Sequence, residues 1–227
     1  MSKTLFIAGT GTEIGKTYIS GLLVKKLLES GVNVGYYKAA MSGNDVGADG
    51  KVIPGDALAV KRLSGTEQSL ESMCPFVYEK AVSPHLASKL EGPPFDVSTA
   101  KEGFKKVCAQ YDYVVVEGSG GIVCPMRYDD NERLLLVDLI KEWQTPCLTV
   151  APAGLGTIND VALTAWALEA REIPLRGLIF NYWLGGAMEE DNAFMCEELA
   201  KTKIVAKVAE GASTLDVDPE TLKALFL

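Results

Sequence analysis

Residues 9–17 of this 227-residue chain read GTGTEIGKT, and this segment constrains the fold more than any other. A short apolar run, 5–8, precedes it, and a stretch with apolar residues at helical spacing, 17–29, follows it. The segment approaches the phosphate-binding pattern G-x-x-x-x-G-K-[ST], although five residues instead of four separate Gly9 from Gly15. In a strand–loop–helix unit of this kind, backbone N–H groups and the start of the helix face a phosphate. We expect Lys16 to reach the β- and γ-phosphates and the Thr17 hydroxyl to bind Mg2+; a glycine-rich turn without a ligand is the alternative.

The alternation of strand and helix continues along the chain. Further apolar runs that predict buried strands lie at 32–37, 113–116, 147–151, 175–180 and 204–208. Helical spacing of apolar residues occurs at 100–109, 132–142, 158–170 and 189–200. The pattern predicts the α/β class, with a doubly wound, mostly parallel sheet in a P-loop NTPase-like three-layer sandwich. The length and the lack of a linker predict one domain over residues 1–227.

Ligands bind such sheets at the carboxyl ends of the strands. The predicted strands end at Gly9, Lys38, Glu117, Ala151 and Asn181. These five positions mark the edge of the sheet where we expect the site.

The charge of the chain excludes several classes of partner. Its formal net charge is −8, from 22 basic and 30 acidic residues, which opposes binding to nucleic acid or an anionic membrane surface.

The opening segment MSKTLFIAG has too short an apolar run for a signal peptide, and no apolar stretch approaches membrane length. Both observations predict a cytoplasmic protein. The five cysteines include no CxxC pair, which predicts reduced thiols.

His85 is the only histidine, so a multi-histidine zinc site is excluded. A Ser/His/Asp triad would have to use that one residue. The chemistry therefore depends on lysines, carboxylates, hydroxyls, backbone N–H groups and a bound metal ion.

Two carboxylates are candidates to hold Mg2+, which prefers oxygen ligands. Glu117 ends the apolar run of YDYVVVEGSGG at 111–121, and a solvent-facing strand end is its alternative. Asp56 precedes a helical run in PGDALAV, where a helix N-cap is an equally good interpretation. Lys38 follows the second strand, so it faces the same crevice as Lys16 and could stabilise a transferred phosphoryl group; a solvated lysine is its alternative.

At this point a specific family resemblance appears. The loop GTGTEIGKT resembles the dethiobiotin synthetase loop G-T-x-T-x-V-G-K-T, which carries the same extra residue. Further matching segments follow in the family's order: Lys38 with Ser42-Gly43, Asp56-Ala57, SPHLA at 83–87, VEGSGG at 116–121, LGTIND at 155–160 and Asn181. The resemblance covers residues 4 to about 182.

The resemblance implies a reaction and a set of partners. In that reaction CO2 (or bicarbonate) forms a carbamate on 7,8-diaminononanoate, ATP phosphorylates the carbamate, and the second amine closes the ureido ring of dethiobiotin. ADP and phosphate are released, and Mg2+ accompanies ATP. The family's site lies at a homodimer interface.

Roles carried over from the family fall on named positions of this chain. The catalytic residues implied are Lys38 and Lys16, and the metal ligands implied are Thr17, Asp56 and Glu117. The nucleotide-binding residues implied are Glu13, Ile14, Gly15, Lys16, Thr17, Tyr18, Asp56, Glu117, Gly118, Ser119, Gly120 and Asn181. The substrate-binding residues implied are Thr12 and Ser42, with Leu155, Gly156, Thr157 and Asn159 from the partner subunit's copy. His85, in Ser83-Pro84-His85, is expected to shape a turn before a helix.

The chain also departs from the family pattern. Gly11, Ala39 and Ser119 replace the commoner residues Asp or Asn, Pro, and Ala. Asp160 replaces His and places a negative charge near the expected substrate carboxylate. Tyr182 replaces the Asp that often follows the base-reading Asn, and the segment 207–213 lacks the usual Pro, so the preferred nucleotide base stays open.

Two other functions stay open on the sequence. One is another ATPase of the P-loop superfamily, either amidoligase-like or partitioning-type; the partitioning type carries a lysine early in the loop, where this chain has Thr10, Gly11 and Thr12. The other is a nucleotide-binding regulator without enzymatic activity. Intact Lys16, Lys38 and the two carboxylates favour the enzyme.

Overall fold

A computed structural model describes residues 2–92 and 94–227 of the chain. Its centre is a six-stranded sheet with the strand order β10-β9-β8-β1-β5-β2, in which every neighbouring pair is parallel. The strands are β1 (Lys3–Gly9), β2 (Val34–Lys38), β5 (Tyr113–Glu117), β8 (Cys147–Pro152), β9 (Leu175–Asn181) and β10 (Ile204–Val208). All six strands were predicted from apolar runs, because strands covered on both faces are almost continuously apolar.

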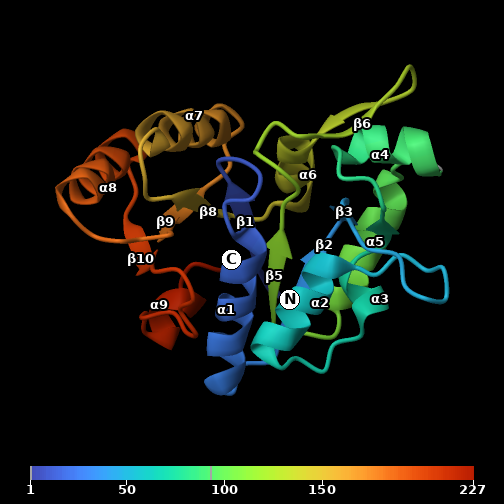
Figure 1. The fold of residues 1–227 in the computed structure, drawn as a ribbon, viewed down its shortest axis with the longest axis horizontal. Coiled ribbons are helices and arrows are strands. Elements are labelled where there is room, and N and C mark those ends of the chain that lie inside the picture. Colours follow the sequence, from blue (N-terminus) through green and yellow to red (C-terminus); the bar gives the residue numbers. More distant parts are fainter. Residues whose placement is uncertain (1, 93) are drawn as a thin grey trace.

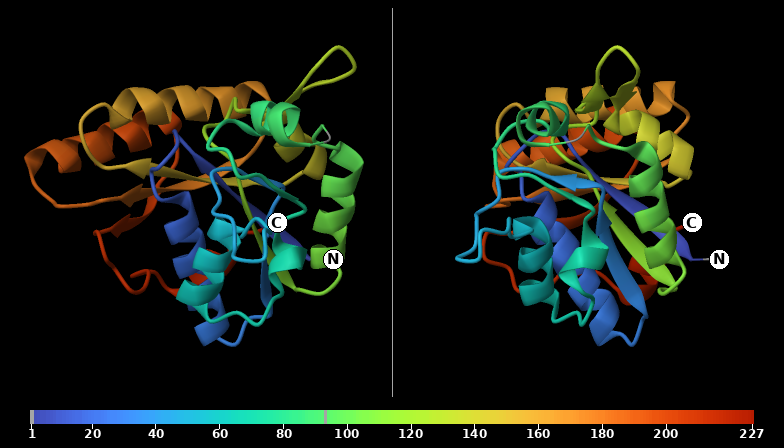
Figure 2. Two further views of the ribbon diagram at one scale, coloured as in Figure 1. Left: turned by 45° about the vertical axis from the view of Figure 1, so that its right-hand side comes forward. Right: turned by 90° about the vertical axis from the view of Figure 1, so that its right-hand side faces the viewer.

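Helices cover both faces of the sheet, as the sequence predicts for a doubly wound α/β fold (Figure 1). One face carries α1 (Lys16–Glu29), α2 (Gly55–Ser64) and α9 (Pro219–Lys223). The other face carries α5 (Val97–Cys108), α6 (Leu136–Trp143), α7 (Thr157–Ala170) and α8 (Ala187–Ala200). The three layers can be followed from two further directions in Figure 2. None of the helices in the described ranges is long and apolar enough to cross a membrane.

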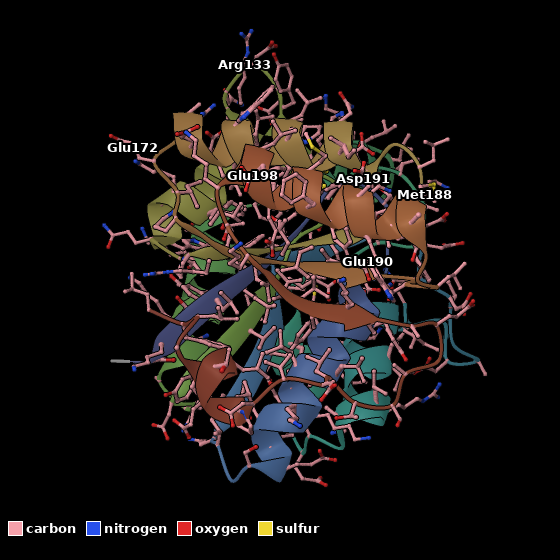
Figure 3. All side chains as sticks on the ribbon, turned by 90° about the vertical axis from the view of Figure 1, so that its left-hand side faces the viewer. Arg133, Glu172, Met188, Glu190, Asp191 and Glu198 are labelled. Carbon is pink, nitrogen blue, oxygen red and sulfur yellow. The ribbon has the colours of Figure 1, made fainter. Side chains whose placement is uncertain are left out.

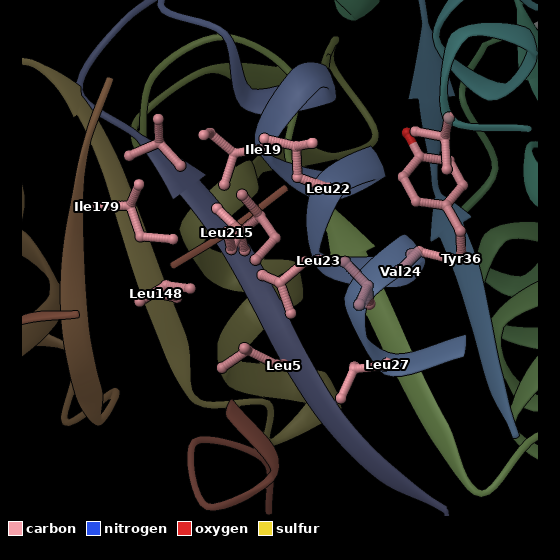
Figure 4. Close-up of a cluster of buried hydrophobic side chains, with 14 of the residues drawn as sticks. Leu5, Ile19, Leu22, Leu23, Val24, Leu27, Tyr36, Leu148, Ile179 and Leu215 are labelled. Atoms are coloured by element: carbon pink, nitrogen blue, oxygen red, sulfur yellow. The ribbon is translucent and has the colours of Figure 1, made fainter. Parts of the chain in front are cut away.

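The two faces have separate apolar cores because successive strand residues point to opposite sides. In β1, Leu5 and Ile7 pack toward α1, whereas Phe6 and Ala8 pack toward the opposite layer. The first core joins buried leucines of α1 to residues of β1, β2, β8 and β9 (Figure 4). This packing fixes the start of α1 above the carboxyl ends of the strands, where the phosphate loop lies.

Short elements complete the fold at the edges. A parallel pair joins β3 (Ala40–Met41) to β4 (Phe76–Val77), and an antiparallel hairpin joins β6 (Pro125–Tyr128) to β7 (Arg133–Leu135). Two short helices, α3 (Leu70–Met73) and α4 (Pro84–Glu91), lie between β3 and α5 in the chain. The termini lie close together because the Leu227 carbonyl accepts a 2.8 Å hydrogen bond from Thr4 N (Figure 2).

The helix predicted over 132–142 is wrong at its start, because residues 133–135 form β7. Asp129 closes the hairpin turn by accepting hydrogen bonds from the backbone N–H groups of Asn131 (2.8 Å) and Glu132 (2.9 Å). The helix begins only at Leu136, where the Asp138 carboxylate accepts a 2.9 Å hydrogen bond from Leu135 N. These two short-range acid–backbone contacts override the apolar periodicity of the segment.

Candidate functional site

The loop between β1 and α1 wraps back on itself around Lys16, the first residue of α1. Gly15 has a left-handed backbone (φ 88°), and a Cβ there would lie 2.1 Å from Asn181 Nδ2, so only glycine fits. The Lys16 ammonium donates a 2.6 Å hydrogen bond to the Gly11 carbonyl. The loop therefore holds a lysine at the start of a helix, where backbone N–H groups are free to meet an anion.

Lys16 is 7% exposed, and burial is the main reason that its pKa is lowered to about 8. The nearby Lys38 ammonium lowers the pKa further, while Glu117 and Asp56 partly offset the shift. A cation held in this way gains from an anionic ligand, because the ligand replaces lost solvation with direct charge pairing.

The Thr17 hydroxyl brings the two candidate carboxylates together. Its Oγ1 lies 2.8 Å from Glu117 Oε1 and 3.0 Å from Asp56 Oδ1. Glu117 is 2% exposed, so the alternative of a solvent-facing strand end is wrong. Thr17, Asp56 and Glu117 come from three separate elements and converge at one point.

Lys38 lies between the same carboxylates. Its Nζ is 2.6 Å from Glu117 Oε1 and 2.7 Å from Asp56 Oδ2. The side chain is buried, so the alternative of a solvated lysine is wrong. Burial alone would lower the pKa of Lys38, but the two carboxylates outweigh it and hold this pKa above its usual value.

Asp56 is not a helix N-cap. The N-cap of α2 is Pro54, and Asp56 lies within the first turn with its carboxylate directed to Thr17 and Lys38. Burial by itself would raise the pKa of Asp56, but the Lys38 ammonium holds it below the usual value. Asp56 therefore stays ionised and available to a cation.

Tyr36 is a member of the site that sequence reasoning missed. Its hydroxyl donates a 2.8 Å hydrogen bond to Glu117 Oε2, the carboxylate oxygen that faces away from Lys38. Burial and the Glu117 charge raise the pKa of this phenol well above its usual value, so it acts as a donor. Tyr36 lies two residues before Lys38 in β2, and this period-two spacing was the only available signal.

Lys16, Lys38 and the Thr17, Asp56 and Glu117 side chains line one pocket with a volume of about 1080 Å³, and Tyr36 lies behind them. Nine of the predicted nucleotide residues line it: Glu13, Gly15, Lys16, Thr17, Tyr18, Asp56, Glu117, Ser119 and Gly120. The catalytic candidate Lys38 and the substrate candidates Thr12 and Ser42 line it too. Lining residues that were not predicted include Met41, Arg62 and Cys124, and Tyr182, singled out beside the base-reading Asn, lines the pocket too. The pocket is large enough for a nucleotide and a second small molecule.

Three predicted nucleotide residues support the pocket wall from behind. Ile14 and Gly118 are buried, and a Cβ at Gly118 would lie 2.9 Å from Phe6 and Leu136. Asn181 Nδ2 donates a 3.0 Å hydrogen bond to the Ile14 carbonyl, which fixes the loop. The Asn181 Oδ1 atom is buried without a partner, so it is a free acceptor beside the loop.

The predicted segment Leu155, Gly156, Thr157 and Asn159 does not line this pocket. It forms the start of α7, where Leu155 is 92% exposed. Asn159 Nδ2 donates a 3.1 Å hydrogen bond to Asp160 Oδ1. Within one chain, this segment therefore lies outside the lining of the pocket that contains the phosphate loop.

His85 has a local structural contact. Its Nδ1 lies 2.9 Å from the hydroxyl of Ser83, the N-cap of α4, and Pro84 is the first residue of that helix. Ser83 and Pro84 line the pocket, whereas His85 does not. The arrangement matches the expected role of His85 in shaping the start of the helix.

The donor set fits Mg2+. Within residues 2–92 and 94–227, no cluster of three or more His, Cys, Asp or Glu side chains could hold a metal ion. Mg2+ does not need such a cluster, since one or two carboxylates, a hydroxyl and phosphate oxygens suffice. Asp56 and Glu117 both pair with the buried Lys38 ammonium, so their oxygens already accommodate a positive charge, and the Thr17 hydroxyl contacts both carboxylates.

Comparisons with known proteins identify relatives over the whole chain. Residues 3–215 match the family model described as an AAA domain. The ATP-dependent dethiobiotin synthetase BioD of Brachyspira hyodysenteriae is 41% identical over 227 residues, covering 100% of both chains. That of Clostridium novyi is 42% identical over 209 residues, covering 92% of this chain and 87% of its own.

Solved structures share the fold at low identity. The MinC:MinD cell division complex of Aquifex aeolicus has a TM-score of 0.58 and 16% identity, covering 92% of this chain and 82% of that chain. A ParA family ATPase of Chlorobium tepidum has a TM-score of 0.58 and 12% identity, covering 99% and 90%. These likenesses confirm the predicted three-layer architecture and carry no statement on activity.

Proposed function

The chain belongs to the ATP-dependent dethiobiotin synthetase family, and from this premise we propose that it makes dethiobiotin from 7,8-diaminononanoate, CO2 and ATP. The observation that carries the proposal is the position of Lys38. It lies between Asp56 and Glu117 in the same pocket as the phosphate loop and Ser42. A buried ammonium there adjoins both the nucleotide phosphates and a second substrate.

The reaction balances without an oxidant or a protein nucleophile. One amine of the substrate adds to CO2 and loses a proton, which gives a carbamate. A carbamate oxygen takes the γ-phosphoryl group and ADP leaves. The second amine then attacks the carbamate carbon, so a C–N bond forms, the C–O bond to phosphate breaks and a proton is released.

In this mechanism the two lysines neutralise charge during phosphoryl transfer. Lys16 reaches the transferred group from the loop, and Lys38 reaches it from β2. Thr17, Asp56 and Glu117 would hold Mg2+, which neutralises phosphate charge when bound. Tyr36 keeps Glu117 oriented through its 2.8 Å hydrogen bond.

Asn181, just behind the pocket wall, is the residue that would recognise the nucleotide base. Its buried Oδ1 lacks a partner, and it would accept a hydrogen bond from an exocyclic amino group such as that of adenine. Tyr182 lines the neighbouring wall with its hydroxyl 3.4 Å from the Glu13 carbonyl. ATP is therefore the proposed co-substrate, and an aromatic ring stands where the family often has a carboxylate.

The proposed site is completed by a second copy of the chain. The start of α7 does not line its own pocket, and α7 exposes Leu155 (92%), Leu163 (54%) and Trp166 (50%). In a two-fold dimer, each α7 would meet the partner subunit. The segment 155–159 would then present N–H groups at a helix start to the substrate carboxylate.

Sedimentation tests this part of the proposal. Wild-type chain is expected to sediment as a dimer, and Trp166→Glu as a monomer that still binds Mg-ADP but has lost ring closure. A wild-type monomer with full activity would contradict a site shared between subunits.

We retain the expectation that the chain binds neither nucleic acid nor an anionic membrane surface. The outer face of α8 carries Glu190, Asp191 and Glu198, with Met188 at its start (Figure 3). An acidic face of this kind opposes nucleic acid and anionic lipid. We likewise retain the cytoplasm as the expected location.

Mass spectrometry tests the function directly. Purified chain is mixed with diaminononanoate, bicarbonate, Mg2+ and ATP, and a control omits the diamine. Dethiobiotin and ADP should form in equal amounts, and only with the diamine. ADP formation without dethiobiotin would favour another ATPase of this fold, and nucleotide binding without turnover would favour the regulator.

A further inference from the structure

Three cationic side chains line the pocket, and two of them are already engaged. Lys38 is paired with Asp56 and Glu117, and Lys16 donates to the Gly11 carbonyl. Arg62 is the third, and neither an ion pair nor a side-chain hydrogen bond joins it to another residue in the described ranges. Its five N–H donors are free for a ligand.

Arg62 lies in the last turn of α2, next to Leu63, which packs on α1. Leu63 packs against Gly21, where a Cβ would lie 2.8 Å from Leu63 Cδ2, so the two helices are in close contact. Arg62 follows Asp56 by six residues, which is about 9 Å along the helix axis. Ala59 lies between them on the helix surface and also lines the pocket, so no bulky side chain separates them.

The phosphate loop gives the direction of the nucleotide. The metal ligands and Lys38 mark the γ-phosphate end, and the other end leads past Tyr18, the third residue of α1. Backbone N–H groups of such a loop cradle the α- and β-phosphates. Tyr18 directly follows Thr17 at the start of α1, and it lines the pocket together with Ala59 and Arg62.

The balance of charges in the pocket lining also supports a ligand-binding role for Arg62. Lys16, Lys38 and Arg62 balance Glu13, Asp56 and Glu117, so the lining is neutral, and the whole chain has a net charge of −8. Mg-ATP is an anion, and without Arg62 the lining itself would be negative. A guanidinium suits this task because its planar fork binds phosphate oxygens in pairs and stays protonated.

We propose that Arg62 is a nucleotide-binding residue that holds the ribose–α-phosphate end of Mg-ATP, a role that rests on the proposed function. Mg-ADP and Mg-ATP share this end, so both lose affinity equally when Arg62 is removed. The expected loss is about tenfold, as for one charge-assisted hydrogen bond. The affinity also becomes less dependent on salt.

Calorimetric titration of the full chain with Mg-ADP and with a non-hydrolysable Mg-ATP analogue tests the proposal. Arg62→Ala should raise both dissociation constants about tenfold, and Arg62→Lys should raise them less. The matched control is Arg176→Ala, since Arg176 is exposed near the amino end of β9, opposite the site, and should leave both constants unchanged. Thermal unfolding without nucleotide should be the same in all three variants.

Two results would overturn the assignment. Unchanged binding in Arg62→Ala would remove the residue from the site, and a loss restricted to the triphosphate would place it at the γ-phosphate. Neither result would touch the proposed function, whose failure would appear as wild-type chain that binds no Mg-nucleotide or makes no dethiobiotin.

Discussion

Lys38 and Glu117 are paired in register across β2 and β5, and their side chains form a 2.6 Å ion pair at the ends of those strands. Both side chains are almost fully buried. The backbone pairing of these two residues, at the carboxyl ends of neighbouring parallel strands, thereby sets the distance between the ammonium and the carboxylate. No flexible loop takes part. The arrangement keeps the proposed catalytic lysine beside the proposed metal ligands before any ligand arrives.

Lys38→Ala should separate binding from chemistry. We expect Mg-ADP binding to persist, because the loop and the metal ligands remain, while ring closure falls at least about a hundredfold with the loss of a cation at the reacting centre. Steady-state production of dethiobiotin together with calorimetric binding checks this. Turnover near the wild-type rate would remove Lys38 from the mechanism.

The same variant should depend on Mg2+ for its stability. Removing the ammonium leaves Asp56 and Glu117 facing each other without a cation, which costs about 3 kcal/mol of unfolding free energy. Mg-ADP supplies the missing positive charge, so it should stabilise Lys38→Ala more than wild type. Denaturant titrations with and without Mg-ADP measure both effects. Equal stabilisation of the two proteins would contradict the proposal that Asp56 and Glu117 hold both the Lys38 ammonium and Mg2+.

Tyr36→Phe should weaken metal binding while the fold is retained. The ring still fills its place in the core, but Glu117 Oε2 loses its 2.8 Å donor. A buried carboxylate oxygen left unpaired costs about 1–3 kcal/mol. We expect the Mg2+ concentration needed for half-maximal activity to rise, and Tyr111→Phe, at a phenol outside the site, should leave it unchanged.

Much of this site was predictable because it follows strand ends. The apolar runs located all six strands of the main sheet, and the residues after β1, β2 and β5 then fell at one edge. Asp56 was harder, since an acid in the first turn of a helix has an ordinary capping role that only the distances to Thr17 and Lys38 exclude.

The remaining parts depend on long-range geometry. From the sequence Tyr36 is an ordinary core aromatic residue, and only the hydrogen bond from its hydroxyl to Glu117 shows that it belongs to the site. From the sequence Arg62 is an ordinary surface residue of a helix. Only the packing of α2 on α1 shows that it lines the pocket. The β6–β7 hairpin was not predicted because strands of three or four residues are too short to show a periodic pattern of apolar residues.

Cys124 gives a pH-dependent probe of the pocket. Burial raises the pKa of its thiol, an effect that Lys16 and Lys38 only partly oppose, so little thiolate exists at neutral pH. Alkylation by iodoacetamide should be slow at pH 7 and should accelerate as the pH rises through and beyond the usual thiol range.

Mg-ADP should protect Cys124, which lines the pocket, but not Cys108, a half-buried thiol outside it. Peptide mapping after alkylation resolves the two sites. Equal protection of both cysteines would mean that binding changes the accessibility of thiols throughout the structure, and that the bound nucleotide does not shield Cys124 directly.

Asn159→Ala should weaken diamine binding far more than nucleotide binding. The residue lies at the start of α7 and does not line its own pocket, and the proposed dimer places it against the substrate carboxylate in the partner's pocket. The KM for diaminononanoate should rise about tenfold or more with little change in the KM for ATP. Equal losses for both ligands would contradict this placement.

Asp160→Asn should act in the opposite direction. In the wild type, the Asp160 carboxylate accepts a 3.1 Å hydrogen bond from Asn159 Nδ2, which draws that donor away from a ligand, and its charge repels a substrate carboxylate. Neutralising it should lower the KM for diaminononanoate severalfold at low salt, with a smaller effect at high salt because the residue is exposed. The matched control is Asp191→Asn, on the outer face of α8. A KM that rises in Asp160→Asn would mean that the carboxylate supports substrate binding through Asn159, and the assigned repulsion would then be wrong.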